Sequence, residues 1–134
     1  MIDKKSVIIG LIISIVLVVT LGYVAVPGPF IGVLIGAMIA SYLANKKNQL
    51  TVAESALHGI LVGIFVGIVQ ILIIYTKNGF SENIVAILLI GASVLIGAYI
   101  IVGALGGVVG TLIHVKFGKT YKKSNMELED QPEQ

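Results

Sequence analysis

Four long apolar runs, separated by short polar or proline-containing segments, divide the chain. They cover residues 6–26, 29–44, 52–75 and 84–115. A helix that crosses a membrane needs about 20 predominantly apolar residues, and the first run meets that length. The pattern predicts an all-α polytopic integral membrane protein with four transmembrane helices.

The segments between the runs carry helix start and stop signals. Residues 27–29 (PGP) form a turn, and a proline suits the first turn of the second helix. Residues 51–54 (TVAE) match a capping box, in which the threonine hydroxyl and the glutamate carboxylate bind the first amides of a helix. Residues 77–79 (KNG) end the third run, and Ser81 is placed to cap the fourth helix.

The first two runs each leave an alternative open. Lys4 and Lys5 before the first run resemble the start of a signal peptide, but the apolar part of a signal peptide is only about 7–15 residues long. An uncleaved first span is therefore favoured. The second run reaches only about 24 Å at 1.5 Å per residue, which makes a re-entrant half-span the alternative. Lys46 and Lys47 at its end favour a full crossing.

The fourth run is too long for one straight span. A helix over residues 84–115 measures about 48 Å, and fitting it into a bilayer of about 30 Å requires a tilt near 50°, beyond the usual range of about 0–40°. We expect a kink or helix break between Gly97 and Gly107, around the glycines at 103, 106 and 107. Two short spans are the alternative.

Lysine positions favour four spans. With the N-terminus inside, every lysine except Lys77 lies on the cytoplasmic side, whereas five spans would divide the lysines almost evenly. We therefore predict a multi-pass protein of the cell membrane with both termini in the cytoplasm. Residues 1–117 form its single transmembrane domain. Residues 118–134 turn from basic to acidic, cannot bury a core, and are predicted to be a mobile cytoplasmic tail.

Small residues recur at every fourth position of the second and third runs, and glycines recur in the fourth. In lipid no hydrophobic force draws one helix to another, so close contact between backbones must supply the attraction. We expect the second and third helices to pack through these stripes, within one chain or between chains. The predicted packing residues are Gly28, Gly32, Gly36, Ala40, Gly59, Gly63, Gly67, Gly103 and Gly107.

Composition agrees with a lipid environment. The chain is 57% hydrophobic and 12% charged, against about 25% charged residues in an ordinary soluble domain. It has no cysteine, which excludes disulfides, thiolate metal sites and a cysteine nucleophile. A net charge of +2 is too small to suggest nucleic acid as a partner, and all basic residues are lysines, so the arginine forks favoured for phosphate are missing.

Few polar residues are candidates for a site. Glu54 and His58 share one helix face, and with His114 they could hold zinc or relay a proton. The favoured interpretation is a capping glutamate and two interfacial histidines, with no metal and no cofactor. Gln70 lies on the face of Gly59 and is predicted to hydrogen-bond across a helix interface, with pore lining as the alternative. The hydroxyls of Ser14, Thr20, Ser93 and Thr111 are expected to return to their own helices.

A succession of motifs runs from the second helix to the third: Pro29-Phe30, Gly32, Gly36, Tyr42-Leu43, a short polar loop, and then Gly59, Gly63 and Gly67. It resembles a family of small archaeal membrane proteins of unknown function with about four predicted helices. The resemblance covers roughly residues 20–115. It implies an archaeal membrane, and it brings no catalytic residue.

Two functions from different classes remain. No nucleophile with a base, phosphate loop or pair of acids is present, so no enzyme is predicted. One function is a structural or accessory protein that associates with itself or joins a larger membrane complex. The alternative is a small oligomeric pore, holin-like or transporter-like. Pores usually present rings of charge, carbonyls or hydroxyls, and the absence of charge from residues 6–26 and 84–115 favours the accessory role. The expected partners are the lipid bilayer and other membrane subunits, without nucleic acid.

Overall fold

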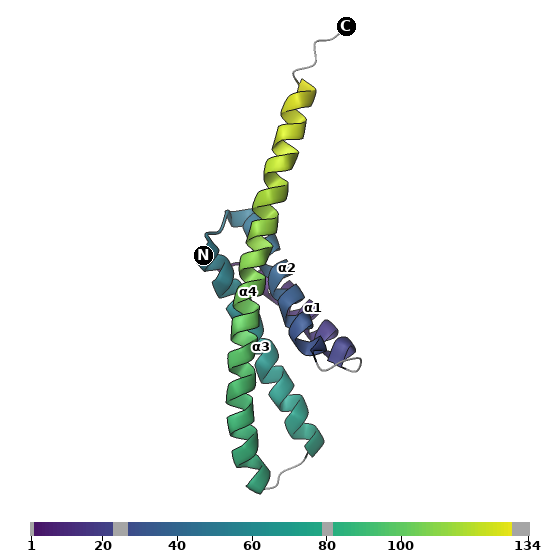
Figure 1. Cartoon of the computed structure of the whole chain (residues 1–134), viewed down its shortest axis with the longest axis vertical. Coiled ribbons are helices and arrows are strands. Elements are labelled where there is room, and N and C mark those ends of the chain that lie inside the picture. The colour runs from purple at the N-terminus through teal and green to yellow at the C-terminus, as the bar shows by residue number, and fades with distance from the viewer. Residues whose placement is uncertain (1, 23–26, 79–81, 130–134) are drawn as a thin grey trace.

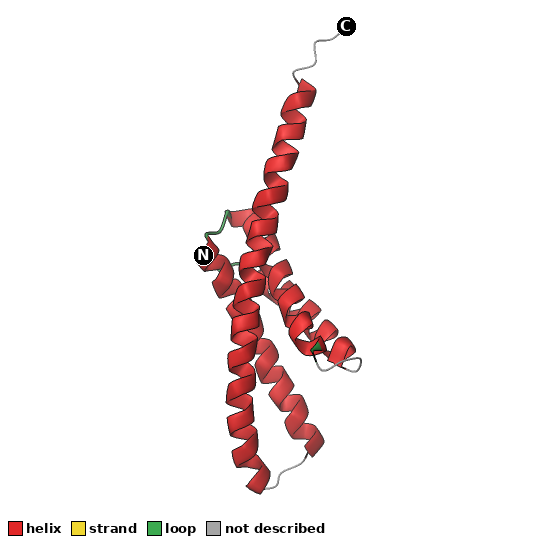
Figure 2. Ribbon diagram, viewed as in Figure 1, coloured by secondary structure: helices red, strands yellow, loops and turns green. Residues whose placement is uncertain are grey.

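The computed structural model describes residues 2–22, 27–78 and 82–129. They form four α-helices: α1 (Lys4–Gly22), α2 (Gly28–Asn48), α3 (Val52–Asn78) and α4 (Glu82–Glu129) (Figures 1 and 2). All four are long and apolar enough to cross a membrane. The predicted all-α fold with four candidate spans is confirmed. The predicted end of the first run at residues 23–26 and the predicted cap at Ser81 lie outside the described residues.

Local signals set the ends of α2 and α3. Pro29 stands in the first turn of α2, and α2 ends at Gln49, whose left-handed conformation (φ 47°) lets its N–H bind the Asn45 carbonyl at 3.1 Å. The capping box at the start of α3 is confirmed. The Thr51 N–H donates to Glu54 Oε2 at 3.0 Å, and the Glu54 N–H donates to Thr51 Oγ1 at 3.3 Å.

The helix break expected in the fourth run is absent, so that part of the expectation is wrong, whereas a kink between Gly97 and Gly107 stays a prediction. Residues Glu82–Glu129 form one continuous α-helix of 48 residues. An interior glycine costs about 1 kcal/mol relative to alanine without removing a backbone hydrogen bond, so the glycines of this run do not by themselves end the helix. No proline stands between residues 82 and 129. The C-terminal part of α4 instead projects beyond the other three helices (Figure 1).

The tail predicted for residues 118–134 is therefore helical as far as Glu129. Its mobility stays a prediction, and residues 130–134 lie outside the described part of the chain.

The helices form two antiparallel hairpins, α1–α2 and α3–α4, and α2 lies between the others. It packs along α1 and α4 and also touches α3, while α1 meets α3 more briefly. Within the described ranges α1 and α4 do not touch. The hairpins lie together near the N-terminus and diverge toward their turns (Figure 1). Contacts between the two hairpins include the rings of Phe30 and Tyr99, whose centroids are 5.2 Å apart.

The small residues of α2 face α1. A Cβ built on Gly32 would lie 2.8 Å from the Val18 backbone nitrogen, and one on Gly36 would lie 2.6 Å from the Gly10 carbonyl oxygen. A Cβ on Gly10 would in turn lie 2.5 Å from the Ala40 Cβ. These distances leave no room for a side chain at Gly10, Gly32 or Gly36.

The glycines of α3 face α4. A Cβ on Gly59 would overlap the Gly103 carbonyl oxygen, and one on Gly63 would overlap the Tyr99 carbonyl oxygen. On the other side of α4, a Cβ on Gly106 would lie 2.6 Å from the Leu34 carbonyl oxygen of α2. Gly103 and Gly107 thus meet α3 on one face of α4, Gly106 and Gly110 meet α2 on the next, and these contacts lie within one chain.

Candidate functional site

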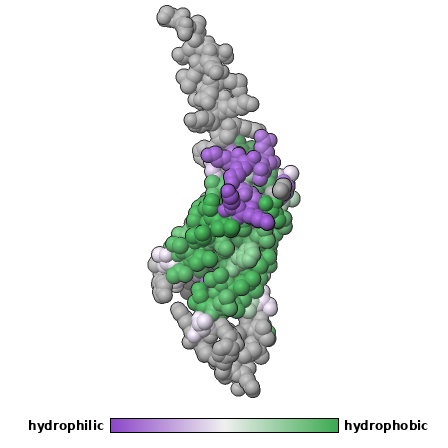
Figure 3. Space-filling model, turned by 180° about the vertical axis from the view of Figure 1, so that it is seen from behind, coloured by the Kyte–Doolittle hydropathy of each residue, from purple (hydrophilic) through white to green (hydrophobic). Residues whose placement is uncertain are grey.

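Polar side chains gather at one end of the helices, where Figure 3 shows a hydrophilic surface above a hydrophobic band. We call this region, residues 3–6, 41–58 and 111–116, the polar end. Helix direction alternates along the chain, so the starts of α1 and α3 meet the end of α2 here. Five exposed lysines belong to it: Lys4, Lys5, Lys46, Lys47 and Lys116.

Asp3 ties α1 to α2. Its Oδ1 accepts the Lys5 N–H at 3.3 Å, and its Oδ2 accepts the Ser6 hydroxyl at 2.6 Å, as expected of a carboxylate before the first turn of a helix. The Lys47 ammonium donates to the same Oδ2 at 3.0 Å. The hydrogen bond from Ser6, followed by that from Lys47, lowers the pKa of Asp3 from its ordinary value. Asp3 is therefore ionised at neutral pH.

His58 ties α1 to α3 and is fully buried. Its Nδ1 lies 2.7 Å from the Glu54 carbonyl oxygen, and the Asp3 backbone N–H donates to its Nε2 at 3.0 Å. A carbonyl can only accept a hydrogen bond, so Nδ1 carries the proton and Nε2 accepts. These partners fit a neutral imidazole with both nitrogens engaged.

A series of hydrogen-bonded hydroxyl groups, which we call the hydroxyl chain, joins α2, α3 and α4. Thr111 of α4 donates to Ser55 Oγ of α3, which donates to the Thr51 carbonyl oxygen at 2.9 Å. Ser41 of α2 donates to the Ser55 carbonyl oxygen at 2.9 Å. Every hydroxyl in this chain thus donates to an acceptor, which is what burial in a low-dielectric interior requires.

The structure separates the three residues of the alternative metal or proton site. Glu54 caps α3, and His58 is held by Asp3 and the α3 backbone. The His114 ring instead meets the edge of Tyr42, with centroids 5.3 Å apart. Throughout the described ranges, no three of the His, Asp and Glu side chains are arranged to hold a metal ion.

Expectations for the other polar residues have mixed outcomes. The Thr20 hydroxyl returns to the Val16 carbonyl oxygen at 2.6 Å, as predicted. The prediction for Thr111 is wrong, because its hydroxyl crosses to Ser55 of another helix. Gln70 is half-buried in α3, away from the polar end, and its hydrogen bond across an interface stays a prediction.

Two buried polar atoms stand without a hydrogen-bond partner in the described part of the chain: Ser14 Oγ and Asn45 Nδ2. The hydroxyl of Ser14 faces Gly36, where a Cβ would overlap it, so the expected return to its own helix is wrong. Asn45 follows Ser41 by one helical turn of α2. Sequence reasoning passed over it because an amide beside two lysines looks solvated, and only packing shows it to be buried.

Comparison with known proteins identifies a family. The model of a family of unknown function (DUF5518) matches residues 4–113, which include all of α1, α2 and α3 and most of α4. No curated protein and no solved structure matches the chain. The expectation of a family of unknown function is confirmed.

Proposed function

Because the chain belongs to this family of unknown function, we propose its role from its own contacts. It is a non-enzymatic integral membrane protein that acts as a structural or accessory component, by joining a larger membrane complex or associating with itself. It lies in the cell membrane with both termini in the cytoplasm. Its sequence resemblance adds an archaeal membrane to the proposal. It needs no cofactor.

The observation that carries this proposal is the close contact between the backbones of neighbouring helices, which leaves no space for a path between them. At Gly59 and Gly63 the backbone of α3 lies directly on that of α4, and at Gly36 the backbone of α2 lies on α1. A conducting path needs carbonyls, hydroxyls or charges along its walls. The described hydroxyl chain is instead confined to the polar end, where each hydroxyl is already a donor.

A pore between several copies is the second candidate, and the outer faces argue against it. These faces carry large aliphatic side chains that would have to line the path. On α1 they are Ile8, Ile12, Val16 and Val19, and on α4 they are Ile90, Val94, Ile101, Leu105, Val109 and Leu112. Such faces suit lipid or another apolar helix better than water or ions.

The continuation of α4 supports an accessory role directly. The same helix that packs on α2 and α3 in the core continues from Lys116 to Glu129, beyond the polar end (Figure 1). Lysines at 119, 122 and 123 are followed by acidic residues at 127 and 129. A partner bound to this arm would be held at a fixed position relative to the membrane core, because no loop intervenes.

Native mass spectrometry tests the proposal. The full chain would be extracted from its own membranes in mild detergent, and the same preparation would be reconstituted into liposomes for an ion-flux assay. We expect a complex with other subunits, or a small homo-oligomer, and no flux above that of empty liposomes. A ring of identical subunits that conducts ions would establish the pore instead. A strictly monomeric chain would contradict association of either kind.

Topology is tested separately with single cysteines in this cysteine-free chain. Cysteines at Asn48 and Ser124 should resist an impermeant thiol reagent added outside intact cells, and one at Asn78 should react. Labelling at Asn48 together with protection at Asn78 would reverse the proposed orientation.

A further inference from the structure

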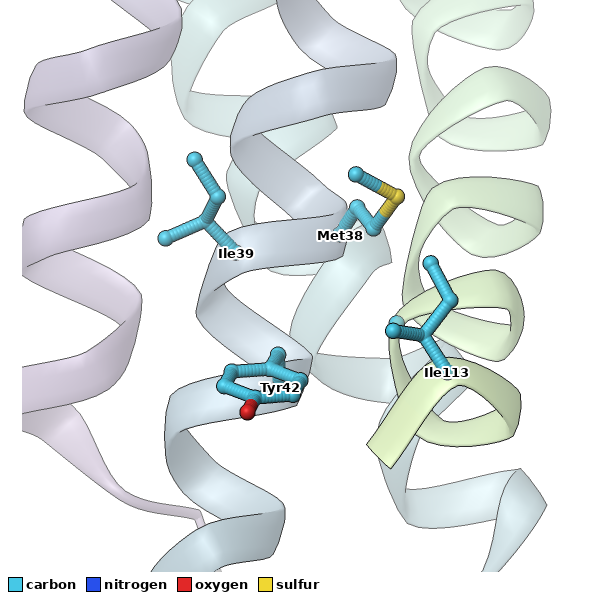
Figure 4. A pocket seen from close by; sticks show the side chains of 5 residues that line it. Met38, Ile39, Tyr42 and Ile113 are labelled. Carbon is cyan, nitrogen blue, oxygen red and sulfur yellow. The ribbon is translucent and has the colours of Figure 1, made fainter. Parts of the chain in front are cut away.

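A groove runs between α2 and α4 just inside the polar end. It has a volume of about 210 Å³ and is lined by Met38, Ile39, Tyr42, Gly110 and Ile113. Met38 on α2 and Ile113 on α4 lie on facing sides of it (Figure 4). A Cβ on Gly110 would overlap the Met38 carbonyl oxygen, so the backbones of α2 and α4 touch beside the groove.

The chemistry of the lining indicates what fills the groove. Apart from the Tyr42 hydroxyl, the side chains that line it carry no hydrogen-bonding group. Its volume is about seven times the share of one water molecule in the liquid, about 30 Å³. Water molecules would be poorly stabilised in such a groove, because each needs about two to four polar partners for its hydrogen bonds. A segment of a lipid acyl chain fits both the size and the polarity.

The rim of the groove is basic. Lys46 follows Tyr42 by one turn of α2, and Lys116 follows Ile113 by three residues of α4; both lysines are exposed. Next to them, the His114 ring packs against Tyr42. Lysine and tyrosine at the end of a span lie at the level of the lipid headgroups, and a basic pocket between helices at that level binds anionic headgroups.

We infer that this groove binds one anionic lipid, with an acyl chain against Met38 and Ile113 and its phosphate between Lys46 and Lys116. Charge complementarity selects an anionic headgroup. The described polar end has five exposed lysines, and its acidic side chains are Asp3 and Glu54. One of the two, Asp3, is paired with Lys47, so the lysines outnumber the carboxylates at this end. This site is independent of the proposed accessory role, since it needs no protein partner.

The headgroup is tested by native mass spectrometry of the full chain in detergent. Phosphatidylglycerol and phosphatidylcholine with the same acyl chains serve as probes. The wild type should retain phosphatidylglycerol preferentially. Lys46→Gln with Lys116→Gln should weaken that binding about fivefold per lysine and leave phosphatidylcholine unchanged. The matched control is Lys4→Gln with Lys5→Gln, which removes the same charge from α1, a helix that does not touch α4 in the described ranges.

The groove itself is tested with a bulkier side chain. Ile113→Phe fills it and should reduce retention of both lipids, whereas Leu112→Phe, on the exposed outer face of α4, should not. Glycerol phosphate should not displace the lipid, because it lacks the acyl chain. Equal retention of the two lipids, equal losses in the two double-lysine variants, or equal effects at 112 and 113 would each overturn the inference. Displacement of the bound lipid by glycerol phosphate would also overturn it, because the site would then bind an anion without binding an acyl chain.

Discussion

Alanine in place of glycine should have opposite effects at two positions of this protein. At Gly63 a Cβ would overlap the Tyr99 carbonyl oxygen and lie 2.8 Å from the Tyr99 carbonyl carbon. These neighbours are backbone atoms of α4, so the two helices must move apart. At Gly97 a Cβ would meet nothing within 4 Å.

The magnitudes follow from these surroundings. Overpacking typically costs about 1–3 kcal/mol, and we expect Gly63→Ala to lower the free energy of unfolding by about that amount. Gly97→Ala meets no obstacle and gains helix propensity, up to about 1 kcal/mol. The two variants should therefore have effects of opposite sign that differ by about 1–4 kcal/mol. Gly67→Ala should fall between them, because its nearest neighbour is a side-chain atom of Ile96, at 3.1 Å, and not the backbone of α4.

The assay is reversible unfolding of the full chain in mixed micelles, followed by circular dichroism, with particle size recorded for each variant. If Gly63→Ala does not fold at all, the order of Gly67→Ala and Gly97→Ala still tests the reasoning. Equal shifts for Gly63→Ala and Gly97→Ala would refute it, because glycine would then act only through helix propensity. A loss of oligomer without unfolding would place the critical contact between chains.

Two further predictions concern the polar end. Ser6 and Lys47 lower the pKa of Asp3 in the folded protein. The stability that this carboxylate contributes should therefore be complete above its ordinary pKa of about 3.9 and be lost as the pH falls through the lower folded-state value. Unfolding midpoints measured against pH should show this loss at acid pH in the wild type but not in Asp3→Asn. His58→Phe keeps a ring but leaves the Asp3 N–H without its acceptor, so it should cost about 1–3 kcal/mol. By contrast, His114→Phe retains the ring contact with Tyr42 and should stay within about 0.5 kcal/mol of wild type; equal unfolding free energies for the two histidine variants would contradict the assignment of His58 as a link between α1 and α3.

The lengths of the apolar runs and the spacing of residues within each run could be interpreted from the sequence alone. Apolar runs of about 20 residues predicted the four helices, since lipid forces each segment to satisfy its own backbone hydrogen bonds. Thr51 and Glu54 lie three residues apart, and the sequence predicted their mutual hydrogen bonds because helix geometry alone brings them together. The recurrence of small residues at every fourth position likewise predicted which residues share a helix face.

Periodicity could not say which helix meets that face. Gly36 faces α1 and Gly63 faces α4, and nothing within either helix distinguishes those partners. His58 is 55 positions from Asp3, so its acceptor role depends on how α1 lies against α3. The continuity of α4 is a similar case: the length of the run argued for a break, but the helix continues unbroken past the polar end. Local hydrogen bonding and solvation by lipid act along one segment, so their effects can be interpreted from sequence. Which of several equally apolar helices becomes the neighbour depends on how closely the backbones of distant segments fit together, and only the tertiary structure decides that.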